Sequence, residues 1–238
     1  FILGQFGGKL ALGGVQACAS LFELAIGFSV GVGAGCAVIS GQFFGSRDDE
    51  RLSRSIHTAM TLALAGGLAI SVAGVAFTPH ILAAMGTPAD LMPEAVPYAR
   101  CYAAAMVCSL VLNMGSALLR SVGDTRTPAM IIASGCVINA ALDILFVAVL
   151  HLEALGCGLA TALTLTVNAA FMTRRLMRAQ GAWRLDLRRL RIDGRICRSM
   201  LATGLPLGIQ SSVYSFSNII LQSTVNTFGT DAVTGWGL

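Results

Sequence analysis

The sequence predicts an all-α protein built from helices that cross a membrane. Hydrophobic residues make up 55% of its 238 residues and charged residues only 12%, and the mean hydropathy is +0.74. Its apolar stretches are about 20 residues long or longer, which is the length that a helix needs to cross a ~30 Å hydrocarbon core. Alternating ten-residue strands, typical of membrane barrels, are not seen. These observations exclude an ordinary soluble domain and predict a polytopic helical bundle.

Six stretches are predicted to be helical spans, each separated from the next by a polar segment. They cover residues 10–44, 56–77, 96–119, 128–150, 154–172 and 200–228. The first residues, Phe1 to Phe6, are interpreted as the end of a helix already in progress, and Phe1 is not an initiator methionine. An irregular loop carrying Pro79, Pro88, Pro93 and Pro97 is expected after the second stretch. We therefore expect the chain to be a piece of a longer protein.

Glycines recur at every fourth position in the first stretch, at Gly27, Gly31 and Gly35. In lipid, a stripe of small residues lets two helix backbones approach closely, so we predict a helix-packing face here. Gly31, Gly33 and Gly35 superficially match a dinucleotide fingerprint, but no strand precedes them and no βαβ unit surrounds them.

Glu23 lies one turn before Gly27 and therefore on the same stripe, where it should face a neighbouring helix. Two interpretations remain open. The carboxylate could contact a cavity or substrate, or it could be bonded locally to a neighbour such as Gln16 or Ser20.

The fourth stretch, 128–150, holds an amide and a carboxylate one helical turn apart, Asn139 and Asp143. An ionisable side chain at membrane depth costs roughly 3 kcal/mol on insertion scales, so its presence is by default a hypothesis about function. The alternative is that Asp143 only ties helices together through hydrogen bonds. Thr127 is expected to cap this helix, with Pro128 in its first turn.

Polar side chains also occur in the last two stretches. Thr161 and Asn168 lie near the middle of 154–172, and the stretch 200–228 is rich in Ser, Asn and Gln. Such residues should face a bundle interior or a wet cavity. The candidates for cavity or substrate contact are Glu23, Asn168, Gln210, Tyr214 and Asn218.

The basic residues predict the orientation of the chain. Alternate loops, at 45–54, 120–127 and 174–198, carry fourteen arginines, nine of them in the last loop, whereas the intervening segments carry only Lys9 and Arg100. By the positive-inside rule the arginine-rich loops are cytoplasmic, so the helix 128–150 runs from inside to outside. Topology thus explains the net charge of +4 without a nucleic-acid partner.

No metal, cofactor or enzymatic site is expected. The seven cysteines are scattered without a C-x-x-C pair, and His57, His80 and His151 share no ligand spacing. Asp48 and Asp49 could hold a metal diphosphate in a membrane transferase, but arginines interrupt the acidic residues and no second acidic motif follows. A solvated loop leading into a helix is the preferred interpretation.

A weak internal repeat suggests two lobes. Phe6-Gly7 followed by Gly13 and Phe228-Gly229 followed by Gly235 have identical spacing, 222 residues apart. Parallel repeats of bundles are a signature of transporters. We expect a first lobe of six helices at 1–198, its first helix largely missing, with a basic connector at 174–198, and the first helix of a second lobe at 199–238.

Four motifs, in order and at suitable spacing, resemble the multidrug and toxic compound extrusion (MATE) transporters. They are Gly41-Gln-Phe-Phe-Gly45, Leu118-Leu-Arg-Ser-Val-Gly-Asp-Thr-Arg-Thr-Pro128, Gly204-Leu-Pro-Leu-Gly208 and Phe228-Gly-Thr-Asp-Ala232. The resemblance covers essentially the whole chain. It implies a monomer of twelve helices in two lobes, located in the plasma or inner membrane, which exports cationic or amphiphilic compounds in exchange for H⁺ or Na⁺.

In one prokaryotic branch of that family, the resemblance implies a cation site at Asn139, Asp143 and Thr161. The first-helix acid of that branch would precede Phe1 and so lie outside this chain. Another branch has a glutamate in its seventh helix, but the matching region near Tyr214 has no acidic residue. Glu23 departs from the family pattern and receives no role from it.

A flippase for a lipid-linked precursor is the alternative on the same helical architecture. It would predict a large arginine-lined cavity, and at membrane depth this chain offers little beyond Arg100.

Overall fold

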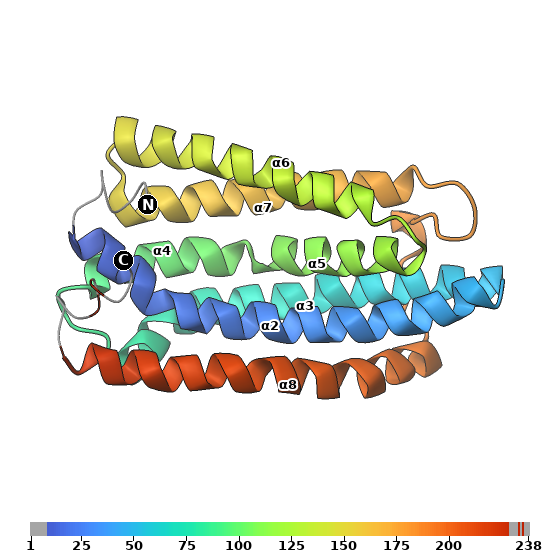
Figure 1. Cartoon of the computed structure of the whole chain (residues 1–238), viewed down its shortest axis with the longest axis horizontal. Coiled ribbons are helices and arrows are strands. Elements are labelled where there is room, and N and C mark those ends of the chain that lie inside the picture. Colours follow the sequence, from blue (N-terminus) through green and yellow to red (C-terminus); the bar gives the residue numbers. More distant parts are fainter. Residues whose placement is uncertain (1–8, 229–232, 234, 236–238) are drawn as a thin grey trace.

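The protein forms an elongated bundle of helices (Figure 1), seen here in a computed structural model that describes residues 9–228, 233 and 235. The helices are α2 (Lys9–Gly45), α3 (Asp49–Ala84), α4 (Met92–Ala104), α5 (Met106–Ser121), α6 (Arg126–Asp143), α7 (Glu153–Met177) and α8 (Gly194–Asn226). A π-helical segment, η1 (Ile144–Val149), continues α6, and a short 3-10 turn, η2 (Leu187–Arg189), precedes α8. The described residues contain no strand, so the predicted all-α fold is confirmed.

Four segments of the described chain are long and apolar enough to cross a membrane: α2, α3, α6 with η1, and α7. Helices α4 and α5 form a fifth span if they are counted together, and they meet at an angle of 45° around Ala105. The predicted stretch 96–119 is therefore a broken span. The Ser, Asn and Gln residues of α8 make it more polar than these spans.

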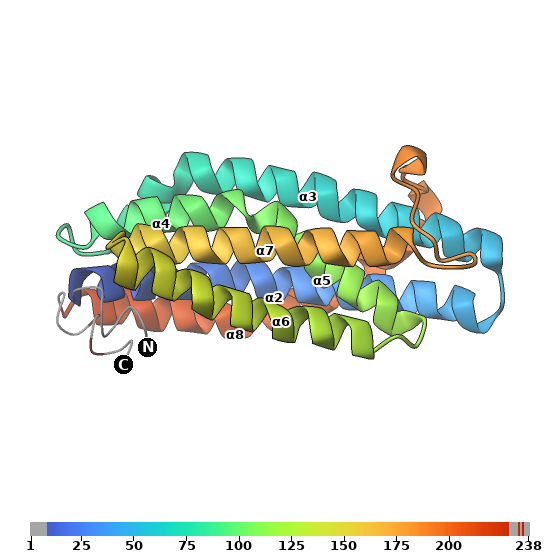
Figure 2. The same cartoon turned by 90° about the horizontal axis from the view of Figure 1, so that it is seen from above.

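The long helices lie side by side along the long axis of the molecule (Figures 1 and 2). Helix α8 lies at one edge against α2, and these two helices make the most extensive contact of any pair. Helix α6 lies at the opposite edge against α7. Helices α4 and α5 pack between α2, α3 and α7. The edge position leaves most of α6 exposed, with only Pro128 and Gly135 fully buried.

The predicted glycine stripe of α2 is a packing face. Gly31 lies against the backbone of Gly208, and Gly35 against the backbone of Gly204, so closely that a Cβ atom on either α2 glycine would overlap α8. Gly33, which points elsewhere, has room for a methyl group, because its nearest neighbour would be the Ala117 side chain at 3.6 Å. Glycine at these two positions thus permits the α2–α8 contact.

The expected proline-rich loop after the second stretch is shorter than predicted. Pro79 lies inside α3, which continues to Ala84, and Pro93 and Pro97 lie inside α4. Pro93 occupies the first turn of α4, where a backbone N–H has no intrahelical partner to lose. Only Pro88 remains in the connecting loop.

Asp124, not Thr127, caps the start of α6. Its carboxylate accepts hydrogen bonds from the backbone N–H of Thr127 at 3.0 Å and from the hydroxyl of Thr127 at 2.8 Å. The Arg175 guanidinium at the end of α7 also donates to this carboxylate at 3.0 Å. Partial burial raises the pKa of Asp124, but these hydrogen bonds and the charge of Arg175 outweigh it and hold the pKa below its usual value.

The connector between α7 and α8 is bonded to α3. The backbone N–H of Asp186 donates to Nε2 of His57 at 3.1 Å, and that of Asp193 donates to the hydroxyl of Thr58 at 3.1 Å. Asp193 also forms an ion pair with Arg54 at 3.6 Å. These contacts fix the start of α8, at Gly194, to the helices that precede it.

Candidate cation site between α6 and α7

One face of α6 carries three residues at intervals of four: Gly135, Asn139 and Asp143. The facing side of α7 carries a second row, spaced by four, three and four residues, which consists of Cys157, Thr161, Thr164 and Asn168. Side chains from the two rows meet at three levels along the antiparallel pair. We call these seven residues the polar seam.

At the first level the side chain of Asn168 fills the space that Gly135 leaves open. A Cβ atom on Gly135 would overlap the amide of Asn168. Asn168 is 5% exposed, and its Oδ1 atom is buried with no hydrogen-bond partner among the described residues. A buried acceptor oxygen without a donor costs about 1–3 kcal/mol, so this oxygen is available to a ligand.

At the second level Nδ2 of Asn139 donates to the hydroxyl oxygen of Thr164 at 3.5 Å. This bond lies at the long end of the hydrogen-bond range and is therefore weak. It turns the amide of Asn139 toward α7 and leaves its carbonyl oxygen available. Thr164 itself is 7% exposed.

At the third level the carboxylate of Asp143 is half-buried beside the thiol of Cys157. Its Oδ1 atom is buried and has no hydrogen-bond partner within the described part of the chain. Tyr98 of α4 is close enough to interact electrostatically with this carboxylate. Asp143 thus presents a second free acceptor to the same seam.

The helix changes form directly after Asp143. The next six residues, Ile144 to Val149, are π-helical, and the N–H of Leu150 donates to the carbonyl of Leu145, five residues earlier, at 3.0 Å. Such wide turns inside a helix are frequent at functional sites. The uninterrupted α-helix predicted for 128–150 is therefore wrong at its C-terminal end.

Thr161 lies on the polar seam between the levels of Asn139 and Asp143, as the spacing of its row requires. Its half-buried side chain forms no hydrogen bond to either residue in the described part of the chain. Thr164 makes that contact with Asn139 instead.

Five of the seven residues of the polar seam carry side-chain oxygens: Asn139, Asp143, Thr161, Thr164 and Asn168. Carboxylate, amide and hydroxyl oxygens suit a proton or a hard cation such as Na⁺, whereas soft or borderline metals prefer thiolate and imidazole. No group of three or more His, Cys, Asp or Glu side chains that could hold a metal occurs among the described residues.

Comparison with known protein families identifies the family of this chain. A family model described as MatE matches residues 1–145, which is more than half of the sequence. The chain belongs to the MatE family. This membership confirms the resemblance noted from its motifs.

Two relatives of the chain are bacterial proteins about twice as long. The Probable multidrug resistance protein YoeA of Bacillus subtilis (strain 168) is 31% identical over 99% of this chain and 54% of its own length. The FAD transporter of Shewanella oneidensis (strain MR-1) is 24% identical over 100% of this chain and 53% of its own length. The chain thus spans about half the length of these relatives.

A solved structure of an inward-facing multidrug resistance MATE family transporter of the MOP superfamily has the same fold. It matches 99% of this chain and 54% of its own chain, with a TM-score of 0.92 and 24% sequence identity. At this identity the match establishes the fold alone.

A second polar group of this MatE-family chain lies between α2 and α8. Nδ2 of Asn218 donates to Oε2 of Glu23 at 3.2 Å, and the side chain of Glu23 is exposed. Within the described part of the chain, the predicted neighbours Gln16 and Ser20 form no hydrogen bond with Glu23, and the Ser20 hydroxyl has no partner. Gln210 is exposed, and the side chain of Tyr214 lies outside the described residues.

Three residues of the polar seam, namely Gly135, Cys157 and Thr164, were not predicted as site residues. The signal for them was present in the spacing, since Gly135 lies one turn before Asn139 and since Cys157 and Thr164 share a helix face with Thr161. A glycine and a cysteine carry no signal of ion binding alone, and only the register of α6 against α7 gives them their place.

Proposed function

We propose that the full-length protein is an antiporter that exports cationic or amphiphilic compounds in exchange for H⁺ or Na⁺, and that the coupling ion binds at the polar seam. Asp143 supplies the charge, and Asn139 and Thr161, the oxygen-bearing seam residues nearest to it, supply neutral oxygens beside it. Thr164 orients the amide of Asn139. The family membership and the multidrug resistance relative support export as the activity.

The observation that carries the proposal is the buried, unpartnered carboxylate oxygen of Asp143 on this seam. Four buried side-chain oxygens lack a hydrogen-bond partner among the described residues, and two of these are Oδ1 of Asp143 and Oδ1 of Asn168. Each of these buried oxygens destabilises the protein while no hydrogen-bond donor or cation contacts it. A bound ion removes this cost at Asp143, which makes occupancy of the seam favourable.

Coupling requires that ion and exported compound favour different states of the two lobes, since a ligand with equal affinity for both states shifts nothing. The polar seam lies within one lobe, between α6 and α7, and α6 is at the edge of the bundle. The π-helical segment after Asp143 is a point at which α6 can bend when the ion binds or leaves. In the predicted orientation this point faces the outside.

For the exported compound we propose cations or amphiphiles, with Glu23, Gln210, Tyr214 and Asn218 as candidate contacts. The exposed carboxylate of Glu23, held by Asn218, supports a preference for positive charge. The relative named as a FAD transporter makes a flavin dinucleotide a second candidate. A flippase is less well supported, because the arginine-lined cavities lie beside the loops predicted to be cytoplasmic, whereas Arg100, the arginine predicted at membrane depth, is exposed near the end of α4.

The test is efflux from vesicles that contain the full-length protein, driven by an imposed gradient. A pH gradient alone and a Na⁺ gradient alone are compared for the wild type and for Asp143→Asn. We expect one of the gradients to drive efflux in the wild type and neither to drive it in the variant. Normal ion-driven efflux by a folded Asp143→Asn protein would refute the assignment.

A further inference from the structure

A cavity of about 450 Å³ opens where the ends of α2, α3 and α8 meet, far from the polar seam. Its polar lining consists of Gln42, Arg51, Arg54, Asp193, Arg195 and Ser199, and the Asp193 carboxylate is already paired with Arg54. Arg54 and Asp193 separate it from a smaller cavity of about 210 Å³ that is also lined by Arg191. Both lie beside loops 45–54 and 174–198, which the charge pattern assigns to the cytoplasmic side.

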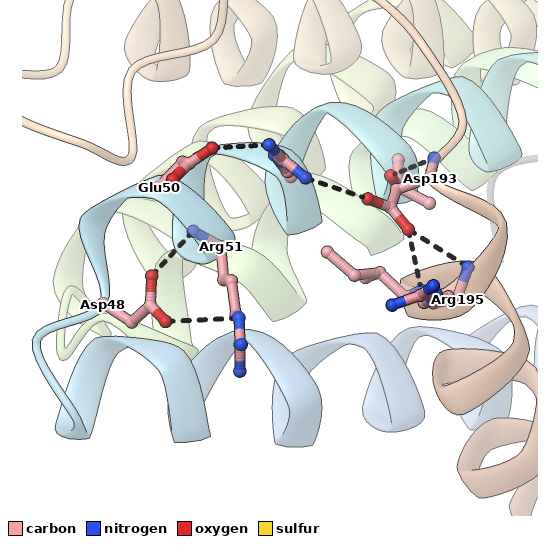
Figure 3. Close-up of polar contacts among 8 residues, drawn as sticks. Asp48, Glu50, Arg51, Asp193 and Arg195 are labelled. Carbon is pink, nitrogen blue, oxygen red and sulfur yellow. Dashed lines mark hydrogen bonds and ion pairs between the residues drawn. The ribbon is translucent and has the colours of Figure 1, made fainter.

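The arginines of this cavity are unequally neutralised (Figure 3). Arg54 lies between two carboxylates, those of Glu50 and Asp193. Arg51 contacts Asp48 through its Nε atom at 3.3 Å, and the end of its guanidinium group points away from Asp48 in Figure 3.

Arg195 differs from both. Its backbone N–H donates to Asp193, but its guanidinium has no carboxylate within 4.0 Å among the residues that the structure describes. Among the described residues, the cavity is therefore lined by one guanidinium without a counter-ion, that of Arg195, and by a second, that of Arg51, which keeps free N–H donors.

The remaining walls of the cavity are apolar. Ile39 and Phe43 of α2 and Ile196 of α8 complete its lining. Contact with these apolar side chains would not stabilise a bound soluble anion. A molecule that joins an anionic group to a hydrocarbon part would use both kinds of wall, which is the arrangement of a phospholipid at the membrane surface.

We propose that this cavity binds the headgroup phosphate of an anionic phospholipid from the cytoplasmic leaflet, between Arg51 and Arg195, with the lipid's glycerol and upper chains against Ile39, Phe43 and Ile196. Guanidinium groups bind phosphate oxygens through paired, charge-assisted hydrogen bonds. Because the cavity joins α8 to α2 and α3, a bound lipid bridges the first helix after the connector to the helices before it.

The experiment measures thermal unfolding of the purified full-length protein in detergent, titrated with phosphatidylglycerol, with phosphatidylcholine or with inorganic phosphate. The variants are Arg51→Gln and Arg195→Gln, both at exposed positions. Arg178→Gln is the matched control, because Arg178 is an exposed arginine of the same connector that lines neither cavity.

We expect phosphatidylglycerol to stabilise the wild type at a lower concentration than phosphatidylcholine or inorganic phosphate does. The phosphatidylglycerol concentration that gives half of the maximal stabilisation should rise about fivefold for each arginine removed and should be unchanged in Arg178→Gln. Equal half-saturation in Arg195→Gln and wild type would overturn the proposal, as would an equal weakening in Arg178→Gln, which would indicate diffuse surface charge. Stabilisation by inorganic phosphate that also prevents the effect of the lipid would overturn it too, since the occupant would then be a soluble phosphate.

Discussion

Gly135 of α6 lies directly against the side-chain amide of Asn168 of α7, with no room for a Cβ atom between them. The two helices can approach at the polar seam only because residue 135 is glycine. This contact sets the register in which Asn139 meets Thr164 and Asp143 meets Cys157. The arrangement of the candidate cation site therefore depends on a residue that cannot itself bind an ion.

Substitution of Gly135 by alanine should separate α6 from α7. Overpacking of this kind typically costs about 1–3 kcal/mol, so we expect a lower unfolding temperature and loss of ion-driven efflux in the full-length protein. Gly66→Ala is the control, since its Cβ would meet only a Leu110 methyl group at 3.9 Å. If Gly135→Ala behaves as Gly66→Ala does, the seam does not have the packing described above.

Alanine at Gly31 or Gly35 should weaken the contact between α2 and α8. Either Cβ atom would overlap the α8 backbone at Gly208 or Gly204, so one helix has to move. Gly33→Ala is the matched control on the same helix, where a methyl group has ordinary contact distance. In unfolding measurements in detergent, the free energy of unfolding of Gly33→Ala should be near that of the wild type. For Gly31→Ala and Gly35→Ala it should be about 1–3 kcal/mol lower. Equal stability of the three variants would contradict this account of the stripe.

The two threonines of the polar seam should respond differently to replacement by valine. Thr164→Val removes the hydrogen bond to Asn139, and such bonds between membrane helices are worth about 0.6 kcal/mol on average. We expect Thr164→Val to lower both stability and the apparent affinity for the coupling ion, and Thr161→Val to lower the ion affinity alone. Unfolding and gradient-driven efflux measured on the same preparations separate the two effects. A stability loss confined to Thr161→Val would place the hydrogen bond on the wrong threonine.

Acid should release the contact between Arg175 and Asp124. Burial raises the pKa of Asp124, but the hydrogen bonds from Thr127 and Arg175 leave it below its usual value in the folded protein. A carboxyl group with a lowered folded pKa contributes stability above its unfolded pKa of about 3.9, and this contribution is lost as pH falls through the folded pKa.

Wild type and Asp124→Asn should therefore differ in unfolding temperature at pH 7 and converge below about pH 4. Thermal unfolding across this range measures the effect. A constant difference down to pH 3 would show that the charge of Asp124 is not responsible.

The membrane spans and the glycine stripe were predictable because each depends on local pattern: apolar length for the spans and spacing of four for Gly31 and Gly35. The prolines misled the prediction. Pro93 is compatible with the first turn of a helix, whereas Pro97 and Pro79 lie inside α4 and α3, where each removes one backbone hydrogen bond that the helix tolerates losing. The π-helical segment after Asp143 has no sequence signal in an apolar run such as Ile144 to Val149.

The candidate site was predictable in its charged and amide members and incomplete in the rest. Asp143 and Asn139 are recognisable because polar groups are costly at membrane depth. Their partners depend on the register between α6 and α7, which a single sequence does not specify. Thr161 and Thr164 both lie on the correct face of α7, and only the structure distinguishes the one that contacts Asn139.

Ion binding at Asp143 is the central claim, and efflux by the full-length protein in vesicles tests it most directly. The account predicts that a pH or Na⁺ gradient drives efflux by the wild type and that Asp143→Asn, correctly folded, exports nothing in response to either gradient. Efflux by Asp143→Asn at the normal rate and with the normal ion dependence would contradict the account.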